Sequence, residues 1–449
     1  MRYSFYTFST LALTLAACGT VSCAPHNASQ AGAPSLPHNV ADTKSWNPLS
    51  GTTAPAGGAL FDTQAPKHHY YDPAKLPQPF ASPSVNNGPH VEDRPDGAEL
   101  HLPKGFAIDE FATGIPGPRK MALAPNGDVF VAVSGADKVT VLRDTNHTGK
   151  ADVVQDYATG LNKPFGIAFY PAKDPQYLYI GNTDSLVRFP YHAGDLQATG
   201  APEKLIDLPG NGYHGHWTRN LLFSKDGKKL YISVGSAGNI ETGEDPHRAA
   251  ILVCNPDGSD LEVFASGLRN PIGTAWNPVT GALWASVNER DGMGDDLPND
   301  YSTSVKPGGF YGWPYYYLGQ NHDSRMPDEP DLKPHVIVPD VLLEPHAAAL
   351  SMTFYQGKQF PKEYHDDAFI AMHGSWNRSI RNGYKVVRLR MKPDGTPVGG
   401  YDDFVWGWAL PDGEVWGRPV DTLVAADGSL LISDDGAGKI WRVSYIDKK

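Results

Sequence analysis

The sequence has little cysteine, no apolar run long enough to span a membrane and no excess of positive charge. Its 449 residues include three cysteines, Cys18, Cys23 and Cys254, so disulfide bonds are not what holds the fold together. No C-x-x-C-H occurs, which excludes a covalently attached c-type haem. The formal net charge of -12 argues against nucleic acid or an anionic membrane surface as the main partner. A small-molecule partner is compatible with this net charge.

The N-terminal segment has the features of an export signal. An apolar run follows Arg2 and closes with Leu15-Ala16-Ala17-Cys18, and it is shorter than the about 20 apolar residues that cross a bilayer. It is either a plain secretory signal cut at small residues or a bacterial lipobox, which "LAAC" resembles and which we favour. On that interpretation residues 1–18 are a signal peptide ending at lipidated Cys18. The protein would then be anchored by lipid to a bacterial membrane, on its periplasmic or cell-surface side.

Two further regions follow. Residues 19–100 are rich in Ala, Pro, Ser, Asn and Gly without a sustained apolar period, which predicts a tether. Residues 101–449 are predicted to form the folded domain, because short apolar strands and polar turns recur throughout them.

A phrase recurs within the second region: "FASGLRNP" at 264–271 repeats the pattern of "FATGIPGP" at 111–118 and "YATGLNKP" at 157–164. Strand–turn–strand units, often with Asp-Gly or Asn-Gly in the turn, recur six times. They begin at Arg119, Phe165, Thr218, Pro271, Leu350 and Arg418. Most are followed by two more short strands, so the sequence predicts an all-β, six-bladed β-propeller with four-stranded antiparallel blades around a central channel.

The ring closes if the strand at 106–114 pairs with "KIWRVSY" at 439–445, which leaves no free sheet edge. A pair of β-sandwiches or an open solenoid is the alternative architecture. A solenoid needs capping repeats with polar outer faces, and neither end of the sequence shows one.

Cationic residues recur where each blade is expected to reach the channel, just before its first strand. Recurrence at one repeat position favours a shared anionic ligand over isolated surface charges. The predicted ligand-binding residues at these positions are Arg119, Arg219, Arg269, Asn270 and Arg418, and "HGSWNRSIR" adds Arg378.

A histidine lies beside this ring. In "GYHGHWTRN", His214 and His216 alternate along an extended segment, and His216 precedes Arg219 by three residues. A neutral histidine at the channel is a natural general base near neutral pH, which makes His216 the candidate catalytic residue.

The stretch "NERDGMGDDLPNDY", 288–301, combines carboxylates with glycines. Carboxylates and main-chain carbonyls are the ligands that Ca²⁺ prefers. The candidate metal ligands are Asp291, Gly292, Met293, Asp295 and Asp296. An acidic, solvated loop is the alternative.

The motifs "GHWTRN", "LRNP", "NERDGMGDDLPNDY", "GGFYGWP", "HGSWNR" and "WGRPVD" together resemble the glucose/sorbosone dehydrogenase family over about residues 102–445. The resemblance implies a propeller dehydrogenase that uses pyrroloquinoline quinone (PQQ) and Ca²⁺. It would oxidise an aldose or a sugar aldehyde of the L-sorbosone kind, and it would pass electrons to an external quinone or cytochrome.

The resemblance also implies roles for single residues. His216 resembles the base that takes the substrate proton, and Arg269 and Asn270 match the "RNP" that holds quinone or substrate. Residues 291–293 resemble the loop whose main-chain carbonyls hold the ion, with Asp295 and Asp296 nearby. Arg418 resembles the arginine that binds a cofactor carboxylate, and Arg378 stands where glucose enzymes of the family have a lysine.

Two other functions are compatible with a propeller. A Ca²⁺-dependent hydrolase of the lactonase kind would need carboxylates and asparagines converging on an axial ion. A non-catalytic carbohydrate-binding propeller would show neither tight quinone binding nor activity. The recurrent arginines favour the dehydrogenase.

Overall fold

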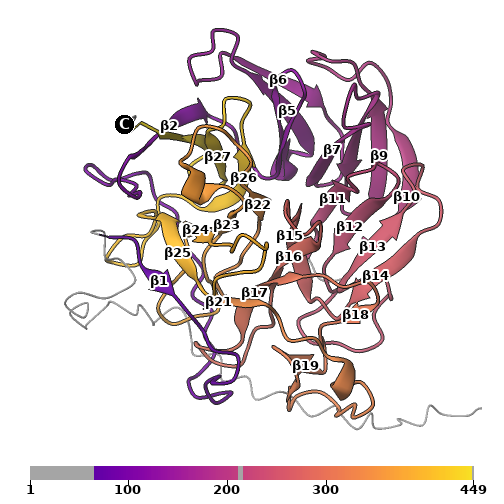
Figure 1. The fold of residues 1–449 in the computed structure, drawn as a ribbon, viewed down its shortest axis with the longest axis vertical. Coiled ribbons are helices and arrows are strands. Elements are labelled where there is room, and N and C mark those ends of the chain that lie inside the picture. Colours follow the sequence, from indigo (N-terminus) through magenta and orange to yellow (C-terminus); the bar gives the residue numbers. More distant parts are fainter. Residues whose placement is uncertain (1–64, 211–215, 447–449) are drawn as a thin grey trace, which may run out of the picture. The chain divides into compact units, whose positions relative to one another are not determined.

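A computed structural model describes residues 65–210 and 216–446 of the chain. Cys18, the predicted lipidation site, lies outside the described residues, as does His214. The described part belongs to one compact unit, 39–449, and is almost entirely β-structure. Figure 1 shows its sheets arranged around a common centre, which confirms the predicted six-bladed propeller.

The six blades follow one another along the chain, and each contains a four-stranded antiparallel sheet. The first three blades consist of β3 (Met121–Leu123), β4 (Val129–Val133), β5 (Lys138–Arg143) and β6 (Val153–Ala158); β7 (Gly166–Tyr170), β8 (Tyr177–Gly181), β9 (Ser185–Pro190) and β10 (Glu203–Asp207); and β11 (Arg219–Phe223), β12 (Leu230–Val234), β13 (Ala250–Cys254) and β14 (Glu262–Ser266).

The last three blades complete the ring (Figure 1). They consist of β15 (Asn270–Trp276), β16 (Leu283–Asn288), β17 (Asn299–Ser304) and β21 (Val341–Pro345); β22 (Thr353–Phe354), β23 (Ala368–Met372), β24 (Lys385–Leu389) and β25 (Tyr401–Val405); and β26 (Pro419–Val424), β27 (Leu430–Asp434), β28 (Lys439–Tyr445) and β2 (Phe106–Thr113).

The central strands are buried on both faces because each blade packs between two others. All five residues of β4 and of β23 are buried, which is why these strands read as unbroken apolar runs rather than as alternating ones. One apolar cluster joins Val131 of the first blade to Leu431 of the last. The core is therefore a ring of interfaces between sheets.

The N-terminal strand closes the ring. β2 pairs antiparallel with β28 from Phe106 opposite Tyr445 to Thr113 opposite Lys439, which confirms the closure predicted from the sequence. The last blade thus combines strands from both ends of the propeller, and β2 covers the edge that β28 would otherwise leave open.

A long insertion lies between β17 and β21. It contains β18 (Gly309–Phe310), which runs parallel to β14, and a small hairpin of β19 (Tyr316–Tyr317) and β20 (Asn321–His322). This insertion delivers Arg325 to the loop that follows β16.

The segment before the propeller differs from the expected tether in its described part, 65–100. β1 (His68–His69) pairs with β25, and the main-chain N–H of Phe80 donates a hydrogen bond to Met293 O at 2.8 Å. Main-chain pairing supplies the order that the apolar pattern did not predict.

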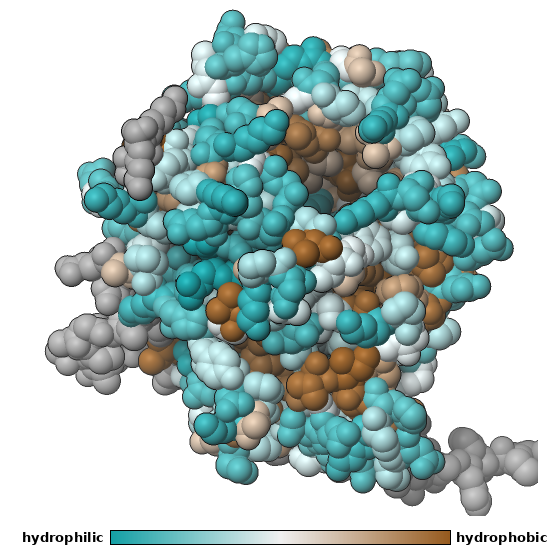
Figure 2. Space-filling view, in the orientation of Figure 1, coloured by the Kyte–Doolittle hydropathy of each residue, from teal (hydrophilic) through white to brown (hydrophobic). Residues whose placement is uncertain are grey.

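Helical structure in the described residues is limited to three short 3-10 turns: η1 (Ser134–Ala136), η2 (Lys333–His335) and η3 (Lys362–Tyr364). Across 65–210 and 216–446, no helix has the length and apolarity needed to cross a membrane. Figure 2 shows one face of the molecule, hydrophilic around its rim and hollowed above its middle, where apolar side chains are visible inside.

Candidate functional site

A cavity of about 270 Å³ lies where several blades meet, and charged and aromatic side chains line it. Its walls come from the starts of the inner strands β11 and β15, from the end of β16, and from the loops before β22 and after β23. The lining includes Arg119, His216, Trp217, Arg269, Asn270, Asp291, Asp300, His346, His373 and Trp376. Predicted residues from distant repeats therefore do converge.

His216 is buried and has a defined tautomer. Its Nδ1 atom lies 2.9 Å from the main-chain oxygen of Ser236, which only accepts hydrogen bonds, so Nδ1 carries the proton. Ser236 Oγ gives its own proton to Gly238 O at 2.6 Å. The neutral ring therefore keeps its lone pair on Nε2. Burial, together with the positive charge of Arg269, lowers the pKa of His216 to about 3.

Arg269 is fixed by the loop after β16. Its Nη1 donates to Glu289 O at 2.6 Å, and its Nη2 donates to Asp291 Oδ2 at 3.0 Å and to Asn239 Oδ1 at 2.9 Å. Burial alone would raise the pKa of Asp291, but Arg269 holds it below its usual value. These bonds hold the guanidinium of Arg269 in one orientation, so its positive charge has a fixed position at the cavity.

Asn270 and His216 approach each other closely over Gly235. A Cβ atom on Gly235 would lie 2.3 Å from Asn270 Oδ1 and 2.8 Å from His216 Cβ. Only glycine leaves room for both side chains, which fixes their places in the cavity wall.

A second charged group reaches the cavity through Arg119 and His373. Arg119 forms an ion pair with Asp435, and its guanidinium lies over the ring of Trp217, 5.4 Å from the centroid. His373 Nε2 lies 2.8 Å from Asp435 Oδ1. Arg418 Nη2, which can only donate, lies 2.9 Å from His373 Nδ1, so His373 is neutral with its proton on Nε2. Burial and Arg418 lower the pKa of His373 to about 4.

Arg418 therefore acts through His373 and is not among the residues that line the cavity. His373 lies within "HGSWNR", but the sequence reasoning singled out only the arginines of that stretch. Arg418 was therefore a predicted site residue, whereas His373, the member of this pair that lines the cavity, was not.

His346 and Asp300 form a third group that was not among the predicted site residues, although Asp300 lies within the acidic stretch 288–301. His346 has a left-handed backbone (φ 59°), and its Nδ1 lies 3.8 Å from Asp291 Oδ1. Burial would lower the pKa of His346, but Asp291 raises it. Burial raises the pKa of Asp300 to about 7. The one sequence signal was position, because His346 precedes the first strand of the fifth blade as Arg119 precedes that of the first.

Arg219 and Arg378 are not brought to the cavity. Arg219 is 0% exposed and donates to the carbonyls of His216, Thr218 and Pro209 at 2.8–3.1 Å. Burial lowers its pKa to about 9. The structure therefore gives Arg219 a role in holding the strand that precedes β11, and its assignment to the cofactor has no support in this geometry.

Arg378 lies over the predicted metal loop instead. Its Nη2 donates to Asp296 Oδ1 at 2.6 Å and its Nε to Asp295 O at 3.2 Å. Asp295 also accepts hydrogen bonds from the N–H of Ser379, at 2.8 Å, and from its hydroxyl. Both carboxylates are thus engaged by the 378–379 segment.

The main-chain carbonyls predicted to hold Ca²⁺ have protein donors as well. Arg325 Nη1 lies 2.9 Å from Asp291 O and 3.2 Å from Gly292 O. Met293 O accepts the hydrogen bond from Phe80 N already described. A calcium ion takes six to eight oxygen ligands, and here each predicted ligand residue already has an oxygen that accepts a hydrogen bond from the protein. The donor set does not fit a cation in this arrangement.

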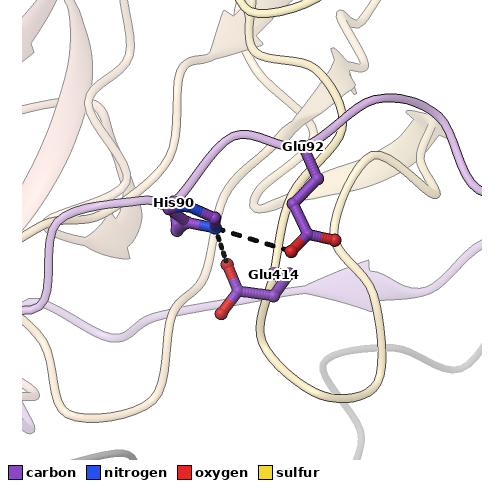
Figure 3. Close-up of side chains that lie close together, drawn as sticks. All are labelled: His90, Glu92 and Glu414. Carbon is purple, nitrogen blue, oxygen red and sulfur yellow. Dashed lines mark hydrogen bonds and ion pairs between the residues drawn. The ribbon is translucent and has the colours of Figure 1, made fainter.

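Another group of possible metal ligands lies at the surface. His90, Glu92 and Glu414 place ligand atoms within 4.8 Å of one another, from the N-terminal segment and the loop before Val415 (Figure 3). His90 Nδ1 shares a hydrogen bond of 3.1 Å with Glu414 and lies 3.5 Å from Glu92, so ordinary polar contacts account for the cluster. It is exposed and outside the cavity.

Comparison with known proteins identifies relatives of this chain. A profile of the family described as Glucose / Sorbosone dehydrogenase matches residues 116–388. An uncharacterized protein of Borreliella burgdorferi is 30% identical over 359 residues, which cover 77% of this chain and 91% of that protein. A pyrroloquinoline quinone-dependent pyranose dehydrogenase of Coprinopsis cinerea is 24% identical; the match covers 76% of this chain but only 54% of that enzyme.

Solved structures share the fold. The holo PQQ domain of the Coprinopsis cinerea pyranose dehydrogenase has a TM-score of 0.65 at 21% identity, covering 79% of this chain and 99% of that domain. A calcium structure of a Trichoderma reesei family AA12 enzyme has a TM-score of 0.67 at 18% identity, covering 79% and 98%. The PQQ-bound aldose sugar dehydrogenase of Streptomyces coelicolor gives 0.55 at 20% identity, covering 76% and 99%.

Proposed function

This chain belongs to the glucose/sorbosone dehydrogenase family, and from that premise we propose that it is a PQQ-dependent oxidoreductase that oxidises an aldose or a sugar aldehyde of the L-sorbosone kind. The Coprinopsis cinerea relative is named as a PQQ-dependent pyranose dehydrogenase, and the Streptomyces coelicolor neighbour is a PQQ-bound aldose sugar dehydrogenase. The observation that carries the proposal is the convergence of a neutral, oriented His216 with Arg269 and Asn270 on one cavity.

The cavity fits a planar, polyanionic quinone in its chemistry. Arg119 and Arg269 supply positive charge, and Trp217 supplies flat apolar surface. Within the described ranges, Arg119 Nε and Asn270 Oδ1 are buried atoms without a hydrogen-bond partner. Arg219 Nε and several tyrosine hydroxyls share this property, but Arg119 and Asn270 line the cavity, so in this proposal a ligand group satisfies them. When bound, the quinone would accept from the sugar carbon a hydride, which carries both electrons of the oxidation.

The chain's own contribution to the reaction is proton transfer. His216 Nε2 takes the proton from the anomeric hydroxyl, or from the hydroxyl of an aldehyde hydrate. The Nδ1–H bond to Ser236 O holds the ring in the tautomer that can do this and stabilises the imidazolium that forms. Asp291, paired with Arg269, keeps a compensating negative charge nearby.

Ca²⁺ is the second cofactor that the family resemblance implies. Since the predicted oxygens already accept protein hydrogen bonds, no step is assigned to the ion. Electrons leave through an external acceptor, a quinone or a cytochrome, in this proposal.

We also propose that Cys18 anchors the protein by lipid on the periplasmic or cell-surface side of the membrane, as "LAAC" predicts. Replacing Cys18→Ala should release the protein from the membrane fraction. Retention of the variant in that fraction would refute lipid anchoring at this residue.

The enzymatic proposal is tested by titrating the purified protein with PQQ and then measuring dye reduction with a panel of aldoses and L-sorbosone. Stoichiometric quinone binding and sugar-dependent dye reduction that His216→Ala abolishes would support it. Absence of quinone binding at micromolar concentrations would overturn it and would direct attention to lactone hydrolysis or carbohydrate binding.

A further inference from the structure

A guanidinium occupies the loop for which the sequence predicts a calcium ion. Arg325 Nη1 donates to both Asp291 O and Gly292 O, at 2.9 and 3.2 Å. These are main-chain oxygens of the residues that the resemblance assigns to the metal. Arginine carries a permanent positive charge, so the carbonyl dipoles meet a cation that belongs to the chain itself.

Arg325 is held firmly in this place. Its Nε and Nη2 form a two-point ion pair with Asp323, at 2.9 and 2.7 Å. Asp323 is 0% exposed and also accepts a hydrogen bond from Arg290 Nη1 at 3.1 Å. The guanidinium further lies 5.7 Å from the ring centroid of Phe80. Bidentate pairing of this kind fixes orientation as well as charge.

The loop is shaped around the guanidinium. Gly292 has a left-handed backbone (φ +86°), and a Cβ there would lie 2.9 Å from Arg325 Nη1. Glycine is therefore needed both for the turn and for the close approach of the arginine.

The neighbouring oxygens complete the pattern. Met293 O and Gly294 O accept hydrogen bonds from Phe80 N, at 2.8 Å, and His346 Nε2, at 2.9 Å. With the carboxylates of Asp295 and Asp296 bound to the 378–379 segment, every predicted ligand residue has at least one oxygen committed to a protein donor. Binding a hard cation would require several of these bonds to break together.

We propose that Arg325 replaces the divalent cation in this loop, so that the chain folds and binds its quinone without Ca²⁺. The part about quinone binding rests on the proposed function; the occupancy of the loop by Arg325 does not. The positive charge beside the cavity is then permanent, and chelators do not remove it.

The test uses the intact protein in three measurements: calorimetric titration with Ca²⁺, the melting temperature in EGTA and in millimolar Ca²⁺, and PQQ affinity in both conditions. The variants are Arg325→Gln and, as a matched control, Arg143→Gln. Arg143 forms the same two-point pair with Asp128, at 2.7 Å for both bonds, but lies outside the cavity and the loop.

For the wild type, we expect no Ca²⁺ binding, no melting shift and a PQQ affinity that changes by less than about twofold on chelation. In Arg325→Gln, the melting temperature or PQQ affinity should fall and recover at least partly with Ca²⁺, while Arg143→Gln shows no response to Ca²⁺. A wild-type melting temperature that rises with Ca²⁺, or a PQQ affinity that falls about tenfold or more in EGTA, would overturn the proposal.

Two other outcomes are separable. If Arg325→Gln does not fold, the wild type and Arg325→Lys, which keeps the charge without the planar fork, still decide the question. If PQQ binds in neither condition, the proposed function fails, and the Ca²⁺ titration and melting temperatures alone decide whether the loop takes an ion.

Discussion

The Nδ1 atom of His216 lies 2.9 Å from the main-chain oxygen of Ser236, and this contact sets the chemistry that the histidine can perform. A carbonyl accepts and never donates, so the ring is oriented with its basic nitrogen on the other side. The contact is to the main chain, which means that no side-chain substitution elsewhere removes it directly. The role of His216 is therefore best tested at the histidine itself.

Replacing His216→Ala should lower the rate of sugar-dependent dye reduction by about 10²–10⁴-fold, the usual contribution of general base catalysis. PQQ affinity should change much less, because the cationic groups of the cavity remain. Stopped-flow dye reduction and quinone titration of the same preparation separate the two effects. An equal loss of both would show that His216 holds the cofactor rather than moving the proton.

Replacing Gly235→Ala should displace His216 and Asn270 together, since the new Cβ would lie 2.3 Å from Asn270 Oδ1. Displacement of catalytic groups by about 1 Å costs on the order of 10²-fold in rate. Dye-reduction kinetics of the folded variant measure the loss.

The control is Gly135→Ala, where an added Cβ meets nothing within 4 Å. It should retain wild-type rates. Unchanged kinetics in Gly235→Ala would contradict the placement of His216 and Asn270 over this glycine.

Much of the fold could be predicted because the blades are built from local signals. Turn residues and short β-branched strands recur six times, and ring closure follows from the need to cover the two end strands. The described part of the N-terminal segment escaped prediction because main-chain pairing holds it, as between His68 and Asp402, and that leaves no apolar period in the sequence.

The site was only partly predictable for a related reason. A repeat position shows which residues approach the axis, and Arg119, Arg269 and Asn270 do line the cavity. A repeat position does not show which way a side chain points. Arg219 points away from the cavity and donates a hydrogen bond to Pro209 O. Arg325 comes from an insertion outside the repeat, so no periodic signal could have placed it in the 291–292 loop.

Replacing Arg219→Gln should therefore reduce stability rather than quinone binding. The guanidinium donates three hydrogen bonds to main-chain oxygens at a fully buried position, and losing charged hydrogen bonds of this kind costs about 3 kcal/mol. Urea denaturation measures the free energy of unfolding, and titration of the folded fraction measures PQQ affinity. A weakened affinity at unchanged stability would restore Arg219 to the cofactor site.

Replacing Trp376→Ala should weaken substrate binding. Trp376 lines the cavity yet is 39% exposed, so its ring is available to stack on an incoming sugar. We expect KM to rise by about tenfold with kcat nearly unchanged, which is the pattern for lost uniform binding. Tyr70→Ala, which removes an aromatic side chain that is 63% exposed and outside the cavity, should leave both constants unchanged.

The buried, neutral state of His216 makes stability depend on pH in a defined direction. Its pKa is about 3 in the folded protein, against 6.5 for an ordinary histidine, so below pH 6.5 the unfolded chain binds a proton that the folded chain refuses. The stabilisation is complete above pH 6.5 and is lost as pH falls toward 3, by at most about 1.4 kcal/mol per pH unit. Asp300, with its pKa raised to about 7, acts in the opposite sense, because its folded form holds a proton that the unfolded form releases.

Comparing the wild type with His216→Gln isolates the histidine from Asp300 and His373. Urea denaturation at pH 7 and pH 5 should show a smaller loss of stability in the variant, by on the order of 2 kcal/mol. Equal losses in the two proteins would mean that His216 is protonated in the folded state at pH 5. A histidine already protonated there could not serve as the base at that pH, so this measurement bears on the mechanism as well as on stability.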